Sequence, residues 1–198
     1  MGTDGKRAAA TEATRRAIIT AAQDLLAARR WQQFTIDAVA KRAGVTRVTV
    51  YNQARSKHGL LEAVLTDLTE RARMDQLLND TQHLSAADAC AAIIRRTCRF
   101  WHAERHILRP VFGLAGVDHE VAATLRQREQ WREEQLRRLL QRLADETTQQ
   151  ARFTSHDTLA AALALTSFPT YDSLGDIADD PERAAQLINH LVRSLTDH

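Results

Sequence analysis

Hydroxyl, amide, phenol and cationic side chains that could bind another molecule lie close together in residues 35–57, TIDAVAKRAGVTRVTVYNQARSK. Two short helices joined by a four-residue turn around Gly44 would form a helix-turn-helix unit. Ala40, Val45 and Val50 are expected to face inward and to set the crossing of the two helices. The other side chains of the second helix would then point outward, where a helix can meet base edges in the major groove. These outward residues are Arg47, Val48, Thr49, Tyr51, Asn52 and Gln53.

Start and stop signals mark both short helices. Thr35 can cap a helix over 36–43, because its hydroxyl accepts a backbone N–H of the first turn. Gly44 is expected to end that helix, since glycine adopts the left-handed backbone of a tight turn without strain. Thr46 can cap the next helix, over 47–53. Local chemistry therefore predicts where this unit turns.

A second set of residues could bind a metal. Cys98, His102 and His106 recur every four residues and would share one face of a continuous helix, a geometry that suits zinc or copper. The helix is expected to end near Ala103, however, and no further acidic or thiol partner is spaced to complete the site. The stretch HAERH also differs from the HExxH pattern of zinc proteases. We expect neither a metal nor a cofactor.

Catalytic signatures are missing from the sequence. It has no glycine-rich phosphate loop, no Gly-x-Ser-x-Gly turn and no pair of carboxylates placed for acid–base chemistry. An enzyme is therefore not expected.

The elements that must position these residues are helices. Gly and Pro number only 7 and 3 in 198 residues, and no long run of β-branched residues alternates with polar ones. We expect an all-α fold of about nine helices, with an N-terminal three-helix helix-turn-helix domain and a C-terminal helical bundle. Pro169 should kink the eighth helix, and Asp180 followed by Pro181 should start the last one. The expected helices cover residues 11–29, 36–43, 47–53, 57–78, 86–103, 106–112, 119–147, 155–174 and 181 onward.

Charge is unevenly distributed along the chain. Residues 1–58 carry a net charge of +7 and residues 59–198 a net charge of −5, within an overall +2. A basic first third is typical of a domain that meets phosphate. No apolar run approaches the ~18 residues of a membrane span, and residues 1–16 lack an apolar signal core. We expect a cytoplasmic protein without a membrane partner.

The helix-turn-helix stretch resembles the DNA-binding domain of the TetR family of one-component repressors. The residues that carry the resemblance are Ala43, Gly44, Val45, Tyr51, Ser56, Lys57 and Leu61. The likeness covers about residues 12–65, and it implies a DNA-binding domain over 1–56 and a ligand-sensing, dimerising domain over 57–198. An aromatic is usual in the family at Ala54, and Trp31 is expected to fill that space from the other side.

The resemblance implies contacts to operator phosphates. Thr35, Tyr51 and Lys57 would bind them through hydroxyl, phenol and ammonium groups. Lys6 and Arg7 would form a flexible arm that reaches the minor groove.

The resemblance also implies a set of base contacts. Arg47 would pair with guanine in bidentate fashion, and Val48 and Thr49 would touch a thymine methyl group. Gln53 or Asn52 would bind adenine. The alternative is that these side chains are only the solvated face of a helix.

Dimerisation is expected through the last two helices. The eighth helix is too apolar for the surface of a monomer and the ninth carries one apolar stripe, while the resemblance implies a four-helix bundle with the mate in a homodimer. The candidate interface residues are Leu165, Phe168, Tyr171, Leu187, Leu191 and Leu195. The alternative is that they close the core of one protomer.

The resemblance further implies a pocket for a small hydrophobic effector, whose binding shifts the fourth helix and releases DNA. Five aromatic residues could line it: Phe100, Trp101, Phe112, Trp131 and Phe168. Three residues could orient a polar group of the ligand: His102, Arg105 and Tyr171. The alternative function is a helix-turn-helix regulator controlled by a protein partner, which a core without a cavity of ~300 Å³ would favour.

Overall fold

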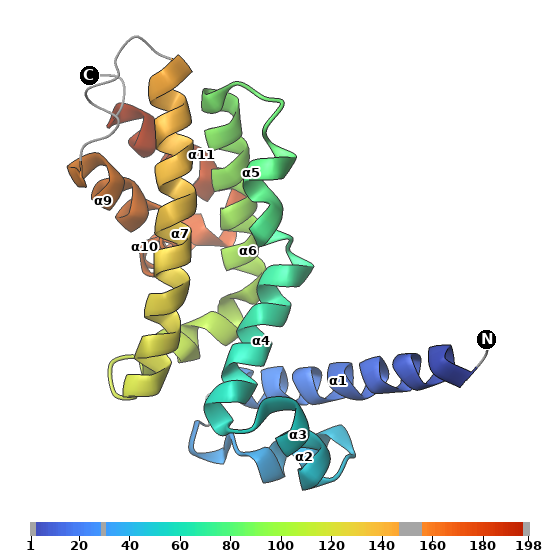
Figure 1. Ribbon diagram of the computed structural model, residues 1–198. Helices are drawn as coiled ribbons and strands as arrows, with labels where there is room; N and C mark the ends of the chain where they lie inside the picture. Colours follow the sequence, from blue (N-terminus) through green and yellow to red (C-terminus); the bar gives the residue numbers. More distant parts are fainter. Residues whose placement is uncertain (1–2, 29–30, 147–155, 196–198) are drawn as a thin grey trace.

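The computed structural model describes residues 3–28, 31–146 and 156–195, and their regular structure is helical throughout, without strands (Figure 1). This confirms the all-α prediction. No helix within these ranges combines the length and the apolar character needed to cross a bilayer.

The N-terminal end of the molecule contains four elements: α1 (Thr3–Ala27), the 3₁₀ turn η1 (Trp31–Gln33), α2 (Ile36–Ala43) and α3 (Arg47–Ala54). Both short helices of the predicted unit are present, and α2 has the predicted bounds. Buried Ile18, Ala22 and Phe34 form the core beneath them. The unit is therefore held on α1 at one end of the molecule (Figure 1).

The predicted flexible arm is wrong, because α1 already begins at Thr3. Lys6 and Arg7 lie in its first turns with exposed side chains. The run of alanines that follows has the highest helix propensity, and the Thr11 hydroxyl donates to the Arg7 carbonyl at 3.0 Å. The predicted end of this helix at Arg29 lies outside the described residues.

The body is built on α4 (Lys57–Arg71), α6 (Ala86–Leu114) and α7 (His119–Glu146). In Figure 1, α4 rises from the helix-turn-helix unit and runs beside α6 and α7. It ends at Arg71, earlier than predicted, because Arg73 adopts a left-handed backbone with φ of 52°. The 3₁₀ turn η2 (Met74–Gln76) and the short α5 (Leu77–Asp80) then complete this side.

Helix α6 is continuous, so the predicted break near Ala103 is wrong. Pro110 lies inside the helix. The buried stripe from Ile94 to Val111 continues through that position, and its packing outweighs the one backbone bond that proline removes. Cys98 and the two histidines therefore share one helix, with the thiol buried and the His106 ring exposed. Across the described ranges, no group of three His, Cys, Asp or Glu residues could hold a metal ion.

The predicted eighth helix is interrupted rather than kinked. It consists of α9 (His156–Leu165) and α10 (Phe168–Ser173). The Ser167 hydroxyl accepts from the backbone N–H of Thr170 at 3.3 Å, and Pro169 occupies the first turn of α10, where no backbone N–H is needed. Proline thus starts a helix here. The predicted helix boundaries at Thr147 and Ser155 lie outside the described residues.

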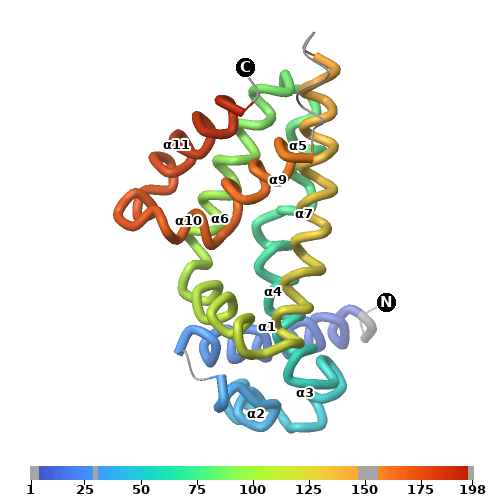
Figure 2. Tube along the Cα trace, turned by 90° about the vertical axis from the view of Figure 1, so that its left-hand side faces the viewer, coloured from blue at the N-terminus to red at the C-terminus, as the bar shows by residue number. Residues whose placement is uncertain are grey.

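The last helix, α11 (Pro181–Ser194), follows the 3₁₀ turn η3 (Gly175–Asp179) and starts as predicted. The Asp180 carboxylate accepts from the backbone N–H groups of Glu182 and Arg183 at 3.0 and 3.1 Å. Figures 1 and 2 show α9 and α11 at the opposite end of the molecule from α2 and α3.

Candidate nucleic-acid interface and ligand cavity

Two helix caps and one glycine turn set the register of α3, and with it the face that points outward. Thr35 and Thr46 each accept a backbone N–H through the hydroxyl, from Ala38 and Thr49 respectively, at 3.1 Å. Gly44 has φ of 68°, the left-handed conformation that its position requires. Val50 is fully buried beneath the turn. The opposite side of α3 is thereby turned to solvent.

The outward face of α3 exposes apolar surface. Val48 is 66% exposed and Tyr51 49%, and Asn52 and Gln53 are also exposed. Arg47 is exposed too, and its Nη1 lies 3.1 Å from the Asp37 carboxylate. A pair of this kind contributes at most ~1 kcal/mol, so the guanidinium can exchange it for another acceptor. This face offers donors, acceptors and two apolar contacts to a groove.

Thr49 and Thr35 have less freedom than the rest of the predicted set. The Thr49 hydroxyl lies 2.8 Å from the Thr46 hydroxyl, and Thr49 is half-buried. Thr35 is exposed, although its hydroxyl is occupied by the α2 cap. A thymine contact by the Thr49 methyl group and a phosphate contact by Thr35 stay predictions.

Lys57 is placed differently from its predicted role at a phosphate. Its ammonium donates to the Trp31 carbonyl at 2.8 Å and lies 3.7 Å from the centroid of the indole ring. Burial lowers the pKa of Lys57, which the charge of Asp118 partly offsets. In this structure Lys57 anchors the start of α4 to Trp31. Its contact with an operator phosphate stays a prediction.

Trp31 joins the helix-turn-helix unit to the body of the protein. Its ring stacks on Phe34 with centroids 5.2 Å apart and meets the His58 ring edge-on. Its indole N–H donates to Asp118 at 3.1 Å, and His58 Nε2 lies 3.2 Å from the same carboxylate. Trp31 therefore packs against the starts of α4 and α7.

Asp118 also caps α7. Its carboxylate accepts from the backbone N–H groups of Glu120 and Val121, both at 3.1 Å. The bond from Val121, together with those from His58 and Trp31, holds the pKa of Asp118 below its usual value. One carboxylate thus ties the cap of α7 to both Trp31 and α4.

Replacing Asp118 by Ala should lower the free energy of unfolding by about 1–2 kcal/mol, because a helix cap is lost and the Trp31 N–H loses its acceptor. Urea denaturation followed by circular dichroism measures this. Asn caps helices about as well as Asp, so Asp118→Asn should retain most of the stability. Equal unfolding midpoints for Asp118→Ala and the parent would contradict this role.

A cavity of about 420 Å³ lies between α4, α6 and α7 and reaches α5 and α11. Most of its wall is aliphatic or aromatic. Four of the predicted residues line it: Phe100, Trp101, Phe112 and Trp131. A volume in this range suits a small organic molecule.

The other four predicted pocket residues do not line the cavity, and that part of the prediction is wrong. Phe168 lies behind the wall, with its ring centroid 5.6 Å from Trp101 and 4.9 Å from Phe112. The Tyr171 hydroxyl donates to the Ala178 carbonyl at 2.7 Å.

The two remaining polar candidates, His102 and Arg105, have partners elsewhere. His102 Nδ1 lies 3.1 Å from the Ala178 carbonyl, and Arg105 pairs with Asp172 at 2.9 Å and Asp179 at 2.6 Å. The interruption before α10 places the residues that follow it against the outer side of α6. All three polar candidates therefore face that segment instead of the cavity.

Sequence reasoning missed the polar residues of the cavity wall that α7 supplies. They are Arg128, Glu129, Arg132 and Gln135. Arg128 and Arg132 continue, at spacings of three and four residues, the apolar stripe that contains Leu125 and Leu136. Polar residues that interrupt an apolar stripe were the available signal, but in isolation they resemble a solvated face.

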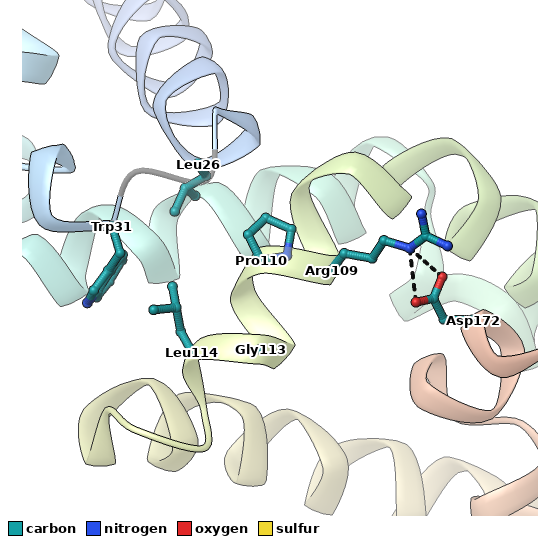
Figure 3. Close-up of a pocket in the computed structure, with 7 residues that line it drawn as sticks. All are labelled: Leu26, Trp31, Arg109, Pro110, Gly113, Leu114 and Asp172. Atoms are coloured by element: carbon teal, nitrogen blue, oxygen red, sulfur yellow. Dashed lines mark hydrogen bonds and ion pairs between the residues drawn. The ribbon is translucent and has the colours of Figure 1, made fainter.

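A second hollow, of about 450 Å³, lies at the junction with α1 (Figure 3). Its lining comes from α1, η1, α6 and α10: Leu26, Trp31, Arg109, Pro110, Gly113, Leu114 and Asp172. The two charged residues of that lining pair with each other, since Arg109 Nε lies 2.7 Å from the Asp172 carboxylate. This hollow therefore offers a ligand no unbalanced charge from its lining.

The predicted dimer surface is only partly available. Phe168 and Tyr171 are buried within the protomer, so their assignment to the interface is wrong. The break before α10 turns both rings inward. Leu165 and Leu187 are half-buried, while Leu191 and Leu195 stay 39% and 37% exposed at the end of α11. An apolar strip on α11 therefore faces outward.

The match to a protein-family model lies in the N-terminal part of the chain. Residues 18–64 match the family model for bacterial regulatory proteins, tetR family. The HTH-type transcriptional regulator AlkX of Mycobacterium tuberculosis is 37% identical over 57 residues, which are 29% of this chain and 27% of that protein.

The structural likeness extends over nearly the whole chain. A transcriptional-regulator structure from Pseudomonas aeruginosa PAO1 superposes with a TM-score of 0.75 at 16% identity, covering 92% of this chain and 90% of that one. The SmeT–triclosan complex superposes with a TM-score of 0.67 at 16% identity, with the same coverage of 92% and 90%. At such identities the likeness shows a shared fold.

Proposed function

Because this chain belongs to the tetR family of bacterial regulatory proteins through residues 18–64, we propose that it is a repressor that binds a palindromic operator as a homodimer and releases it when a small molecule binds. The observation that carries the proposal is the outward face of α3. Val48 and Tyr51 are exposed there beside Arg47, although Val50 of the same helix is fully buried and both short helices are capped. Exposed apolar residues beside an exposed arginine suit contact with a DNA groove.

The cavity supports a small-molecule effector over control by a protein partner. A filled core would have favoured the second candidate, whereas a cavity of about 420 Å³ lies between α4, α6 and α7. Helix α4 forms one wall of this cavity and begins three residues after α3 ends. A ligand with different affinities for two positions of α4 would therefore change the placement of α3.

We place the boundary between two functional domains at the start of α4. We assign DNA binding to residues 1–56 and effector binding and dimerisation to residues 57–198, so α4 opens the second domain. One α3 contacts a single half-site. A two-fold dimer would place two such helices about one DNA turn, ~34 Å, apart.

Replacing Arg47 by Ala should relax sequence preference at one base pair per half-site and cost about 1–3 kcal/mol at the preferred base. Selection of binding sites from a random pool, followed by titration of the best site, measures both. Arg138, exposed on α7 and paired with Glu134, provides the control variant Arg138→Ala. An unchanged preference in Arg47→Ala would exclude Arg47 as a base-reading residue.

A further inference from the structure

Arg128 is the unusual group in the cavity wall. Its Nη2 donates to the Thr66 hydroxyl at 2.9 Å and to the Glu62 carbonyl at 3.3 Å, both on α4. Both acceptors are neutral, and no described carboxylate lies within ion-pair distance of the guanidinium. Burial lowers the pKa of Arg128, which the more distant charge of Glu62 partly offsets. A desolvated cation thus faces the cavity without a counter-ion in contact.

The neighbouring cation is balanced. Arg132 also lines the cavity, but it pairs with Glu129 at 2.8 Å and donates to Thr166 at 2.7 Å and to the Leu163 carbonyl at 2.8 Å. Its charge and its donors are therefore satisfied within the protein.

The two other acids of the cavity wall lie at its rim. Glu70 and Asp75 are exposed, and the Glu70 carboxylate lies 3.8 Å from Arg15. Among the charged residues of the described cavity wall that are at least half-buried, Arg128 is therefore the one without a charged partner in contact. An anionic group is the chemical partner that this position lacks.

The rest of the wall suits an apolar chain. Leucine, isoleucine and methionine side chains surround the cavity together with four aromatic rings. At ~30 Å³ for each water-sized atom, a volume of about 420 Å³ holds roughly a dozen non-hydrogen atoms. That is the size of a carboxylate on an apolar chain of about ten carbons.

We propose that the effector is an amphipathic carboxylate, whose head group binds Arg128 while its apolar chain fills the cavity between α4, α6 and α7. This inference rests on the proposed function for the ligand's effect on DNA, but its binding chemistry can be tested without DNA. The carboxylate competes with Thr66 and the Glu62 carbonyl for the guanidinium. Binding therefore loosens the link from α7 to α4, the helix that follows α3.

The test compares three probes of the same chain length, decanoate, decanol and decyltrimethylammonium, on the full-length protein. Calorimetry gives the dissociation constants, and tryptophan fluorescence gives a second readout, because Trp101 and Trp131 line the cavity. Decanoate should bind at least ~10-fold more tightly than decanol, and the cation should not bind, since an ionised acceptor pairs with the guanidinium more strongly than a neutral one. Equal affinities for decanoate and decanol would overturn the proposal.

Three variants test whether Arg128 is the residue that binds the carboxylate. Arg128→Gln should abolish the preference for decanoate over decanol, whereas Arg126→Gln, at an exposed site on the same helix, should leave it unchanged. Thr66→Val removes a competing acceptor and should tighten decanoate binding by ~2–5-fold. Should Arg128→Gln fail to fold by circular dichroism, Thr66→Val still decides, because unchanged or weaker binding in that variant contradicts the proposal.

Operator binding without ligand separates this inference from the proposed function. If decanoate binds as predicted but the protein does not bind operator DNA, the regulator proposal fails and the cavity assignment holds. If the protein binds operator but decanoate shows no Arg128-dependent binding, the effector class is wrong and DNA recognition stands.

Discussion

Replacing Gly59 by Ala should destabilise the DNA-binding end of this protein by at least ~3 kcal/mol and abolish operator binding. A Cβ atom at Gly59 would lie 1.9 Å from the Ala54 carbonyl oxygen and 3.0 Å from its carbon. Both are backbone atoms, so no side-chain rotation can relieve the clash. The end of α3 would have to move away from α4.

The surrounding contacts oppose that movement. Gly59 donates its backbone N–H to the Ser56 hydroxyl at 2.9 Å, and the Ser56 N–H meets the Ala54 carbonyl at 2.6 Å. Leu60 and Leu61, which follow directly, are fully buried. Relieving the clash would break the α4 cap or disturb this core, and either change alters how α3 is presented.

Thermal and urea unfolding, with operator titration, measure the effect of Gly59→Ala. Gly113→Ala is the matched control, because a Cβ atom at Gly113 would meet nothing within 4 Å. Gly113 lies inside α6, where replacing glycine by alanine should be neutral or stabilise by up to ~1 kcal/mol. If Gly59→Ala unfolds at the same temperature as the parent, the turn between α3 and α4 can adapt to the added Cβ atom.

Replacing Leu191 by Glu should convert the proposed homodimer into monomers. Leu191 is 39% exposed on α11 beside Leu195, and a charge at this position would be buried unpaired in the interface. Such burial costs several kcal/mol, which corresponds to a loss of at least ~100-fold in dimer affinity. Operator affinity should fall with it, because a monomer contacts one half-site.

Sedimentation at micromolar concentration tests this, with 22.2 kDa as the mass of one chain. Val117→Glu provides the control, since Val117 is another aliphatic residue and is 85% exposed in the turn between α6 and α7. It should leave the parent's mass unchanged. A parent that sediments as a monomer, or a Leu191→Glu protein that stays dimeric, would place the assembly elsewhere or exclude it.

Predictions that depend on neighbouring residues were the accurate ones. The caps at Thr35, Thr46 and Asp180 and the turn at Gly44 all appear where the sequence places them. Each involves a hydrogen bond or a backbone conformation within a few residues, so the determining partners are adjacent in the chain.

Predictions that required knowledge of distant partners were less accurate. The predicted helix end near Ala103 is wrong because packing keeps α6 continuous through Pro110, and Pro169, predicted to kink a helix, starts one instead. The contact of the Lys57 ammonium with Trp31, which is distant in sequence, was not predicted. Propensity alone does not show which contacts compete at these positions.

The all-α class, the helix-turn-helix unit and the side of α3 that faces outward could be predicted from the sequence, because helical period and local caps encode them. The tertiary structure alone decided which side chains enclose the cavity: it turned Phe168 and Tyr171 into the protomer core and set Arg128 against α4. The physical reason is that side-chain burial and charge pairing depend on contacts between helices far apart in the chain, and only the packed fold specifies those contacts.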